Sequence, residues 1–575
     1  MSTRAPASRK GWLARHIPIL DWAPTYDRGW LRPDLIAGVT VAALVIPKAL
    51  GYAGIANVPI ENGLYAAAAG TILYAFFGTS RQLSTGPSGA LAAIAGSAVI
   101  LSGVADEAVA SALVAAVALA AGLVFLGMAI LRMGWISQFM SKAVITGFLF
   151  GAAIDVAVGE LPKLTGTSSE GSNVWQEFGS WVRTLGEVHQ TTLLVGIVAL
   201  VALFGLKRFV PAIPGTLIVV IGGLLASAVF DLGSYGVALV GDVPRGLPMP
   251  AIPDLQLVSE NLVIILVAAI GIVAVGFSQT AGDARFFATK HGYRIDVDQE
   301  TVAQGMANIG AGLFQGIPVS TSLSASSLSD NSGAKSAVTS LTTGAVVILT
   351  LIVFAPVFSI LPKAVLGAVI IEAVISGMID IPEMRRLYRV KRFDFGIAVA
   401  AILGVLSFGV LAGIVIGVAL SLGWLVYVTV TPRMPVLGRA PGTHVFRELD
   451  AHPDDEQFAG ILALRLDGGL FFGTADALGD HIREVALSAD PPLTAVVLDC
   501  QGMDFIDSQG SAKLGEFVDL ARANDIAFRL ARVKPSVMEV LSRDGVLERV
   551  GADHVHNDVN EAVTAQLASA PHRGA

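Results

Sequence analysis

The stretches Gly86-Pro-Ser-Gly-Ala-Leu-Ala-Ala-Ile-Ala-Gly-Ser-Ala-Val-Ile-Leu101 and Pro318-Val-Ser-Thr-Ser-Leu-Ser-Ala-Ser-Ser-Leu-Ser-Asp-Asn-Ser332 decide the fold of this chain. Both are too short to cross a bilayer as a helix, and both begin with a proline and small polar residues. Each is the third in a run of seven apolar segments. Short segments interrupted by Gly or Pro at corresponding places in two halves indicate an inverted-repeat transporter. A flexible serine-rich linker is the alternative interpretation of the second stretch.

The composition places most of the chain in a membrane. Hydrophobic residues make up 54% of it and charged residues 15%, against roughly 25% charged residues in soluble proteins. The apolar residues also come in blocks. Phe395–Pro432 contains 38 residues without a charge, enough to cross a ~30 Å hydrocarbon core twice as helices.

Charged residues and Pro/Gly breaks divide the apolar part into fourteen segments. We expect those of the first half at 34–52, 60–78, 87–101, 108–131, 137–160, 191–206 and 213–231. We expect those of the second half at 261–282, 299–315, 320–333, 337–355, 361–378, 394–410 and 412–430. The predicted fold is a polytopic α-helical membrane protein with a 7+7 inverted repeat, followed by a small α/β domain.

The loop charges predict the orientation. The long outward loops, 163–189 and 233–259, carry only three basic residues. The inward loops carry Arg81, Arg132, Lys142, Lys207, Arg208, Arg285, Lys290, Arg294, Arg385, Arg386, Arg389, Lys391 and Arg392. This positive-inside pattern predicts a multi-pass protein with both termini in the cytoplasm. We expect it in a bacterial plasma (inner) membrane.

The C-terminal part is acidic. Residues 443–575 hold 22 of the chain's 46 acidic and 11 of its 38 basic residues, which leaves 24 and 27 for the preceding 442. Such a tail has no electrostatic footprint for nucleic acid. Because Cys500 is the one cysteine in the sequence, the chain can form neither an intrachain disulfide nor a metal site of several cysteines. We expect no metal and no cofactor. The basic N-terminus is not followed by a signal-peptide pattern.

The paired short segments predict an anion site. If both are half-helices whose N-termini meet near the bilayer midplane, they aim unpaired backbone N–H groups at one spot. Each terminus carries roughly half a positive charge, so the pair attracts an anion without a full buried cation. Pro87 suits a first helical turn. The side chains that can cap or donate hydroxyl groups are Ser88, Ser320, Thr321, Ser322 and Ser324.

Several stretches resemble the SulP family of sulfate-permease-like anion transporters. Gly38–Tyr52 is similar to the family's G-x-T-V…I-P-Q-A…Y, and Phe77–Pro87 to the stretch that leads into its third segment. Asp298–Glu300, Gly305–Asn308 and Phe314–Pro318 resemble its segment-9 signature. The similar stretches follow one another in order along nearly the whole chain.

The resemblance implies secondary active transport of a small anion, with a core and a gate domain, elevator-like alternating access and a homodimer, and no enzymatic activity. Sulfate is the family default, and bicarbonate, chloride and dicarboxylates are alternatives. The substrate would lie between segments 3 and 10, next to segments 1 and 8. Carried over by motif, the substrate-binding positions are Lys48, Tyr52, Ser88, Gln279, Ser322, Leu323, Ser324 and Ala325.

Three of these positions depart from the family pattern. Gln279 stands where segment 8 usually offers a carboxylate, Ala325 where segment 10 often has arginine, and Lys48 where segment 1 usually has glutamine. Losing an arginine and a carboxylate together removes a buried pair at little net charge. Lys48 then either restores a positive charge at the site, or snorkels or pairs elsewhere.

The acidic residues leave any coupling ion without an assigned site. A neutral Gln279 weakens proton or sodium coupling at that position. Asp283, one turn on, could stand in for the carboxylate, but it lies near the cytoplasmic end and is expected to be a surface charge. Asp155 and Glu372 lie deeper and should face protein or water. The sequence leaves the role of both open.

The C-terminal region resembles a STAS domain, which this transporter family shares with bacterial anti-sigma-factor antagonists. Strands are expected at 460–466, 493–499 and 526–531, and helices at 475–488, 510–523 and 535–543. Asp504–Gly510 is similar to the domain's D-S-x-G turn, where the antagonists are phosphorylated on the serine that matches Ser508. Ser508 is therefore a candidate regulatory residue, with a helix N-cap as the alternative. The expected domains are 1–33 (N-terminal region), 34–432 (transporter), 433–442 (linker) and 443–575 (STAS).

Two other functions compete with anion transport. A nucleobase or uracil permease could share the fold, but it should carry carboxylates in segments 8 and 10 and lack the C-terminal domain. Gln279 and the acid-free stretch before Asp330 argue against it. The other candidate is a non-transporting anion sensor that signals through its STAS domain.

Overall fold

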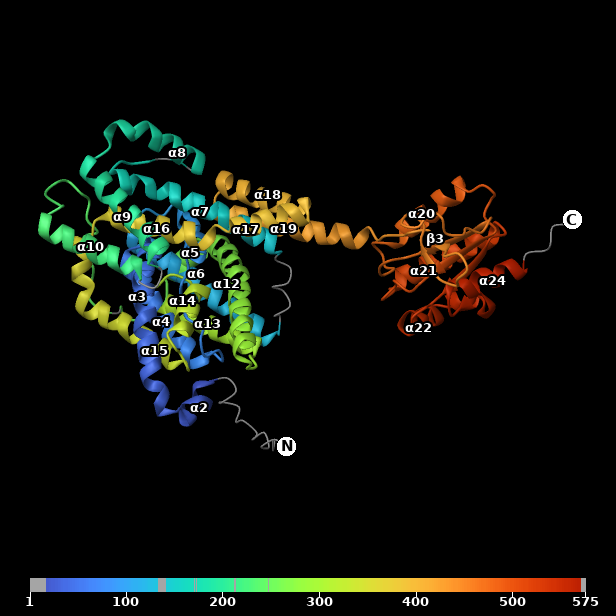
Figure 1. Cartoon of the computed structure of the whole chain (residues 1–575), viewed down its shortest axis with the longest axis horizontal. Coiled ribbons are helices and arrows are strands. Elements are labelled where there is room, and N and C mark those ends of the chain that lie inside the picture. The colour runs from blue at the N-terminus through green and yellow to red at the C-terminus, as the bar shows by residue number, and fades with distance from the viewer. Residues whose placement is uncertain are drawn as a thin grey trace. The chain divides into compact units, whose positions relative to one another are not determined.

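The computed structural model describes residues 17–132, 141–169, 171, 173–210, 214–246 and 248–569 (Figure 1). The chain divides into two compact units, Met1–Ser421 and Leu422–Ala575. The basic N-terminus noted in the sequence lies outside the described residues.

Helices coincide with all fourteen predicted segments of the first unit and the start of the second. In the first half they are α3 (Leu31–Ile55), α4 (Ile60–Phe77), α5 (Gly89–Ser102), α6 (Glu107–Ile130), α7 (Lys142–Thr165), α9 (Gln190–Phe209) and α10 (Gly215–Phe230). In the second half they are α12 (Leu262–His291), α13 (Val297–Leu313), α14 (Leu323–Asn331), α15 (Val338–Leu349), α16 (Lys363–Met378), α18 (Arg392–Phe408) and α19 (Val410–Val430). The first residues of the segments predicted at 137–160 and 213–231 fall outside the described residues.

Eight helical stretches of the described chain are long and apolar enough to cross a membrane, by length and composition. α5 and α10 are shorter apolar helices. The sequence did not predict the N-terminal α2 (Ile19–Trp22) or the connecting helices α8 (Val174–Arg183), α11 (Leu255–Glu260) and α17 (Ile381–Val390). Both α8 and α17 are amphipathic, with one apolar and one polar face, so a search for continuous apolar runs does not detect them.

The helices of the first unit form two groups that meet at α3 and α16. In one group, the core domain, α3, α4, α5, α6, α12, α13, α14 and α15 pack on one another. In the other, the gate domain, α7, α9, α10, α16 and α18 do so. Each group draws helices from both halves of the chain, as the colours of Figure 1 show.

A two-stranded pairing sets the two half-helices end to end. β1 (Thr85–Pro87) runs antiparallel to β2 (Val319–Thr321), with Gly86 opposite Ser320. α5 begins directly after β1, and α14 directly after β2. Because the strands are antiparallel and adjacent, the helices start at one place and leave it in opposite directions. The predicted meeting of two helix N-termini follows from this register.

The position of α5 also depends on a close backbone contact with the end of α3. A Cβ atom added at Gly96 would lie 2.3 Å from the carbonyl oxygen of Ile55, at the end of α3. Only glycine fits at this distance, so α5 approaches α3 more closely than a residue with a side chain would permit.

Two buried carboxylates fix the loops that flank this crossing. Glu300 accepts hydrogen bonds from the backbone N–H of Thr79 (2.7 Å) and of Ser80 (3.0 Å), just before β1. Asp34 accepts bonds from the backbone N–H of Lys335 (2.6 Å) and the hydroxyl of Ser336 (2.6 Å), just after α14. A buried carboxylate is stable when its oxygens are satisfied in this way, so both residues serve as anchors of the core domain.

The second unit is an α/β domain. Its parallel sheet has the order β5 (Ile461–Arg465), β6 (Ala495–Asp499), β7 (Ala527–Ala531) and β8 (Val555–His556). Its helices are α20 (Ala475–Ser488), α21 (Ser508–Ala523), α22 (Pro535–Arg543), α23 (Val546–Val550) and α24 (Val559–Ser569), and β3 (Leu437–Arg439) and β4 (Phe446–Glu448) form a hairpin. The three predicted strands and three predicted helices coincide with β5, β6, β7, α20, α21 and α22. The hairpin, β8, α23 and α24 were not predicted, because most of them are too short for a periodic pattern.

Candidate anion-binding site

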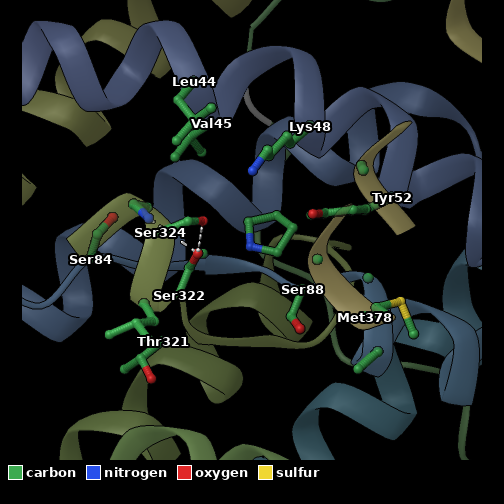
Figure 2. Close-up of a pocket in the computed structure, with 18 of the residues that line it drawn as sticks. Leu44, Val45, Lys48, Tyr52, Ser84, Ser88, Thr321, Ser322, Ser324 and Met378 are labelled. Carbon is green, nitrogen blue, oxygen red and sulfur yellow. Dashed lines mark hydrogen bonds between the residues drawn. The ribbon is translucent and has the colours of Figure 1, made fainter. Parts of the chain in front are cut away.

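A cavity of about 550 Å³ lies where the half-helices meet (Figure 2). All eight substrate-binding positions predicted from the motifs line it: Lys48 and Tyr52 of α3, Ser88 before α5, Gln279 of α12, and Ser322, Leu323, Ser324 and Ala325 at the start of α14. Core-domain and gate-domain helices both contribute to its walls, because residues of α9 and α16 line it as well.

The α5 end of the cavity offers unused donors. Ser88 is the N-cap residue of α5, with an extended backbone, but its side chain makes no capping hydrogen bond. Its hydroxyl forms no hydrogen bond with any residue that the structure describes. The first N–H groups of a helix have no intrahelical acceptor, so the hydroxyl and these N–H groups can all bind an acceptor in the cavity.

At the α14 end of the cavity, the serine hydroxyls already take part in hydrogen bonds within the protein. The Ser322 hydroxyl accepts a weak bond from the N–H of Ala325 (3.4 Å) and lies 3.1 Å from the Ser324 hydroxyl (Figure 2). Hydroxyl groups both donate and accept, so this pair can reorient its protons toward an anion. The hydrogen-bonded pair keeps the serines at the helix end.

Helix α12 supports β2 and adds a carboxylate to the cavity. The Gln279 side-chain oxygen accepts a hydrogen bond from the Ser320 hydroxyl (2.9 Å), and Asp283 accepts one from the Thr321 hydroxyl (2.9 Å). Asp283 was expected to be a surface charge. It instead lines the cavity, half-buried, because α12 continues to His291 and so extends well past the end predicted for segment 8.

Lys48 and Tyr52 extend from α3 toward Ser88 and Ser322, as Figure 2 shows. Lys48 is half-buried and forms no ion pair or hydrogen bond with any residue in the described part of the chain. Its one positive charge therefore faces the cavity without a direct partner. Of the two roles that the sequence left open for Lys48, this placement favours the one at the site.

The gate-domain wall contains an ion pair that the sequence did not place at the site. The Lys207 ammonium of α9 lies 2.8 Å from a carboxylate oxygen of Glu372 on α16, and both residues line the cavity. The Glu372 side chain is 9% exposed and that of Lys207 53%. Lys207 was assigned to an inward loop, although α9 runs on to Phe209. The available signal was Glu372, since an acid deep in an apolar helix requires a partner.

The formal charges around the cavity cancel. Lys48 and Lys207 are positive, and Asp283 and Glu372 are negative. A preference for anions then depends on where these charges lie and on the partial charges of the two helix ends. The ends of α5 and α14 and the unpaired Lys48 lie together, whereas Glu372 is neutralised by its contact with Lys207.

Two other residues singled out in the sequence lie elsewhere. Asp155, in α7, does not line this cavity. Ser508 is exposed in the second unit, as the first residue of α21. The helix cap there is Asp507, whose carboxylate accepts a hydrogen bond from the N–H of Gly510 (2.7 Å), so the alternative interpretation of Ser508 as the N-cap was wrong.

Comparison with known proteins matches both units. A family described as "Sulfate permease family" matches residues 31–401, and the STAS domain matches residues 452–562. A probable sulfate transporter of Mycobacterium tuberculosis is 32% identical over 550 residues, covering 95% of this chain and 98% of the relative. The chloroplastic sulfate transporter 4.1 of Arabidopsis thaliana is 29% identical over 578 residues, covering 97% of this chain and 83% of the relative.

Solved structures agree with the fold. The murine solute carrier 26 member A9, an anion transporter in the inward-facing state, aligns with a TM-score of 0.88 at 22% identity, over 99% of this chain and 96% of that one. The transmembrane domain of the cyanobacterial bicarbonate transporter BicA aligns with a TM-score of 0.58 at 20% identity, over 68% of this chain and 98% of that one. The predicted fold class, fourteen segments as an inverted repeat with a C-terminal STAS domain, is confirmed. By the extent of the family match and the relatives' coverage, the chain belongs to the sulfate permease family.

Proposed function

We propose that the chain is a secondary active transporter of small inorganic anions, with sulfate as the first substrate to test. The relatives in Mycobacterium tuberculosis and Arabidopsis thaliana that are named as sulfate transporters, and the family itself, support this proposal. Bicarbonate, chloride and dicarboxylates are the alternatives. The proposed substrate positions are the eight residues predicted from the motifs.

One observation carries the proposal: two helix N-termini and an unpaired lysine face one cavity. Each helix end contributes roughly half a positive charge, so α5 and α14 together contribute about one. Lys48 adds another at the same place. An anion bound between Ser88 and Ser324 would receive backbone N–H and hydroxyl donors as well as this charge. A cation placed there would be repelled.

The position of the cavity between the two domains supports alternating access by an elevator-like movement. All eight proposed positions belong to α3, α5, α12 and α14 or to the residues before them, which form the core domain. The gate domain contributes the other wall through α9 and α16. In the proposed movement the core domain carries the anion past the gate domain. A homodimer in a bacterial inner membrane, with both termini in the cytoplasm, belongs to the same proposal.

The acidic residues of the cavity indicate where a coupling ion would act. Gln279 is neutral and engaged with Ser320, so it offers no titratable group. Asp283 does, and it belongs to the core domain that would move with the anion. Asp283 is the proposed place where a proton or sodium ion would act, if transport is coupled to either.

The family match weakens the nucleobase alternative. The nucleobase alternative lacks the C-terminal domain that the STAS match identifies here. Asp283 does supply a carboxylate in segment 8, but the described residues at the α14 end of the cavity offer serine hydroxyls and no carboxylate. The sensor alternative differs from transport in one measurable respect, because a sensor binds the anion without moving it.

Uptake by proteoliposomes tests the proposal. Purified protein would be supplied with labelled sulfate, with unlabelled sulfate, bicarbonate, chloride or a dicarboxylate as competitor, at varied pH and sodium concentration. We expect saturable uptake and one competitor series that identifies the preferred anion. Saturable binding without uptake would show a sensor, and uptake of uracil without uptake of any anion would show a nucleobase permease.

A further inference from the structure

The gate domain has a second hollow, separate from the anion cavity. Its volume is about 560 Å³, and its apolar walls are Phe150 of α7, Met384 and Tyr388 of α17, and Phe395 of α18. None of these residues lines the anion cavity. The function proposed above does not use this hollow.

One face of α17 is fixed to the gate domain. Glu383 and Leu387 are buried, and Leu387 packs with Ala143 and Ala398. The Glu383 carboxylate lies 3.3 Å from the Lys142 ammonium at the start of α7. These contacts determine which way the helix faces. On the outward side Tyr388 keeps a ring contact with Phe395 (centroids 5.2 Å apart) and lies under the Arg392 guanidinium.

The outward face of α17 combines apolar and basic side chains. Ile381 and Tyr388 are 49% and 52% exposed and border the hollow. Arg385 and Arg389 border it as well. Neither arginine forms an ion pair with any described residue, and the Arg389 Nε donates only to the carbonyl oxygen of Arg385, at 3.5 Å. Among the described residues, the side chains that line the hollow include no carboxylate.

A ligand that matches this face has an apolar body and an anionic head. The loop charges predict that α17 lies at the cytoplasmic membrane surface, within the basic run from Arg385 to Arg392. Basic clusters and amphipathic helices at that surface attract anionic headgroups. Free phosphate would satisfy the arginines but would leave the apolar walls in water. A lipid satisfies both.

We propose that the hollow binds one anionic phospholipid, with an acyl chain against Phe150, Met384 and Phe395 and the phosphate between Arg385 and Arg389. The bound lipid fills the hollow and neutralises both arginines. It also links α17 to α7 and α18 within the gate domain. α17 directly follows α16, the helix that carries Glu372, so the lipid stabilises the part of the gate domain next to the anion cavity.

Lipid binding to the purified full chain in detergent, measured by native mass spectrometry, tests the proposal. Phosphatidylglycerol is expected to bind saturably and phosphatidylcholine with lower affinity. Each basic residue near an anionic lipid surface contributes about fivefold in affinity, so Arg385→Gln with Arg389→Gln should weaken phosphatidylglycerol binding about 30-fold. The matched control is Arg208→Gln with Arg285→Gln, which removes two exposed arginines from predicted inward loops outside the hollow and should change the affinity less than twofold.

Two further ligands separate the headgroup from the chain. Glycerol 3-phosphate carries the anionic group alone and should not compete at concentrations where the lipid saturates. Short-chain phosphatidylglycerol should bind more weakly than the long-chain lipid, because it buries less apolar surface. Equal binding of the two phospholipids, or equal losses in the two double variants, would overturn the proposal. So would a hollow covered by a second copy of the chain, which would show as a dimer that binds no lipid dependent on Arg385 and Arg389.

Discussion

On the core side of the anion cavity, α5 and α14 present helix N-termini and small hydroxyl side chains, and α3 adds Lys48. On the gate side, α9 and α16 present a lysine and a glutamate joined at 2.8 Å. The core wall thus presents the partial positive charges of two helix ends and the unpaired Lys48, with the Asp283 carboxylate of α12 held by the Thr321 hydroxyl. The gate wall carries two full charges of opposite sign that cancel each other.

The difference indicates that the core wall binds the anion and the gate wall does not. A binding wall that moves with its substrate benefits from backbone dipoles, because they require no counterion when the site is empty. A wall that stays behind must not hold the anion, and a closed ion pair meets this requirement. The anion affinity should therefore respond strongly to changes on the core wall and weakly to balanced changes on the gate wall.

The largest effect is expected for Ser324→Glu at the start of α14. It places a full negative charge where two helix ends converge, and Coulomb repulsion over a few ångströms is expected to reduce anion affinity more than about 100-fold, abolishing uptake. Ser324→Gln has nearly the same size without the charge and should retain measurable uptake. Uptake is measured in proteoliposomes containing equal amounts of folded protein. Unchanged uptake by Ser324→Glu would remove α14 from the site.

A smaller effect is expected for Lys48→Gln, which restores the residue that the family usually has there. Removing the unpaired charge of the core wall should weaken anion binding on the order of tenfold. The concentration dependence of uptake reports this change. Lys363→Gln, at the start of α16 and outside the cavity, is the matched control. If Lys48→Gln leaves the affinity as it was, Lys48 snorkels away from the site when the protein is in a membrane.

On the gate wall, the two single substitutions should change anion affinity in opposite directions, and the double substitution should leave it unchanged. Glu372→Gln leaves Lys207 unpaired and should strengthen anion binding about threefold to fivefold, because Lys207 is half exposed and its charge is screened. Lys207→Gln should weaken it by a similar factor. The double variant restores neutrality and should bind like the original protein. If the double variant is instead as impaired as the worse single one, the pair has a structural role and no part in the charge balance.

The smallest effect is expected for Ser88→Ala. The Ser88 hydroxyl has no partner among the described residues, so its removal leaves no protein group unsatisfied. Water can take its place beside the anion, and the net loss should be roughly threefold in affinity. The backbone N–H groups of α5 remain. Ser97→Ala, in the same helix and outside the cavity, controls for helix stability. A loss as large as that of Lys48→Gln would show that α5 acts through this hydroxyl more than through its backbone.

The core wall, apart from Asp283, could be predicted from the sequence, and the gate wall could not. Gly86–Ser88 and Pro318–Ser322 each predict a helix N-terminus from neighbouring residues alone, because a proline and serines at the start of a short apolar segment are typical of one. Lys207 and Glu372 are 165 residues apart, and their contact depends on how α9 packs on α16. A lysine beside Arg208 looks like any inward-loop charge until the helix is seen to continue through it. Asp283 was misplaced for the same reason, since its helix is longer than its apolar run.

The most direct test of the anion site is a structure of the protein with selenate, a sulfate analogue whose selenium is located by anomalous scattering. The account predicts one selenium peak in the cavity, between Ser88 and Ser324 and within reach of Lys48. The peak should disappear in Ser324→Glu and persist in the variant that lacks both Lys207 and Glu372. A peak at the gate wall beside Lys207, or an empty cavity with selenate bound elsewhere in a protein that transports sulfate, would contradict it.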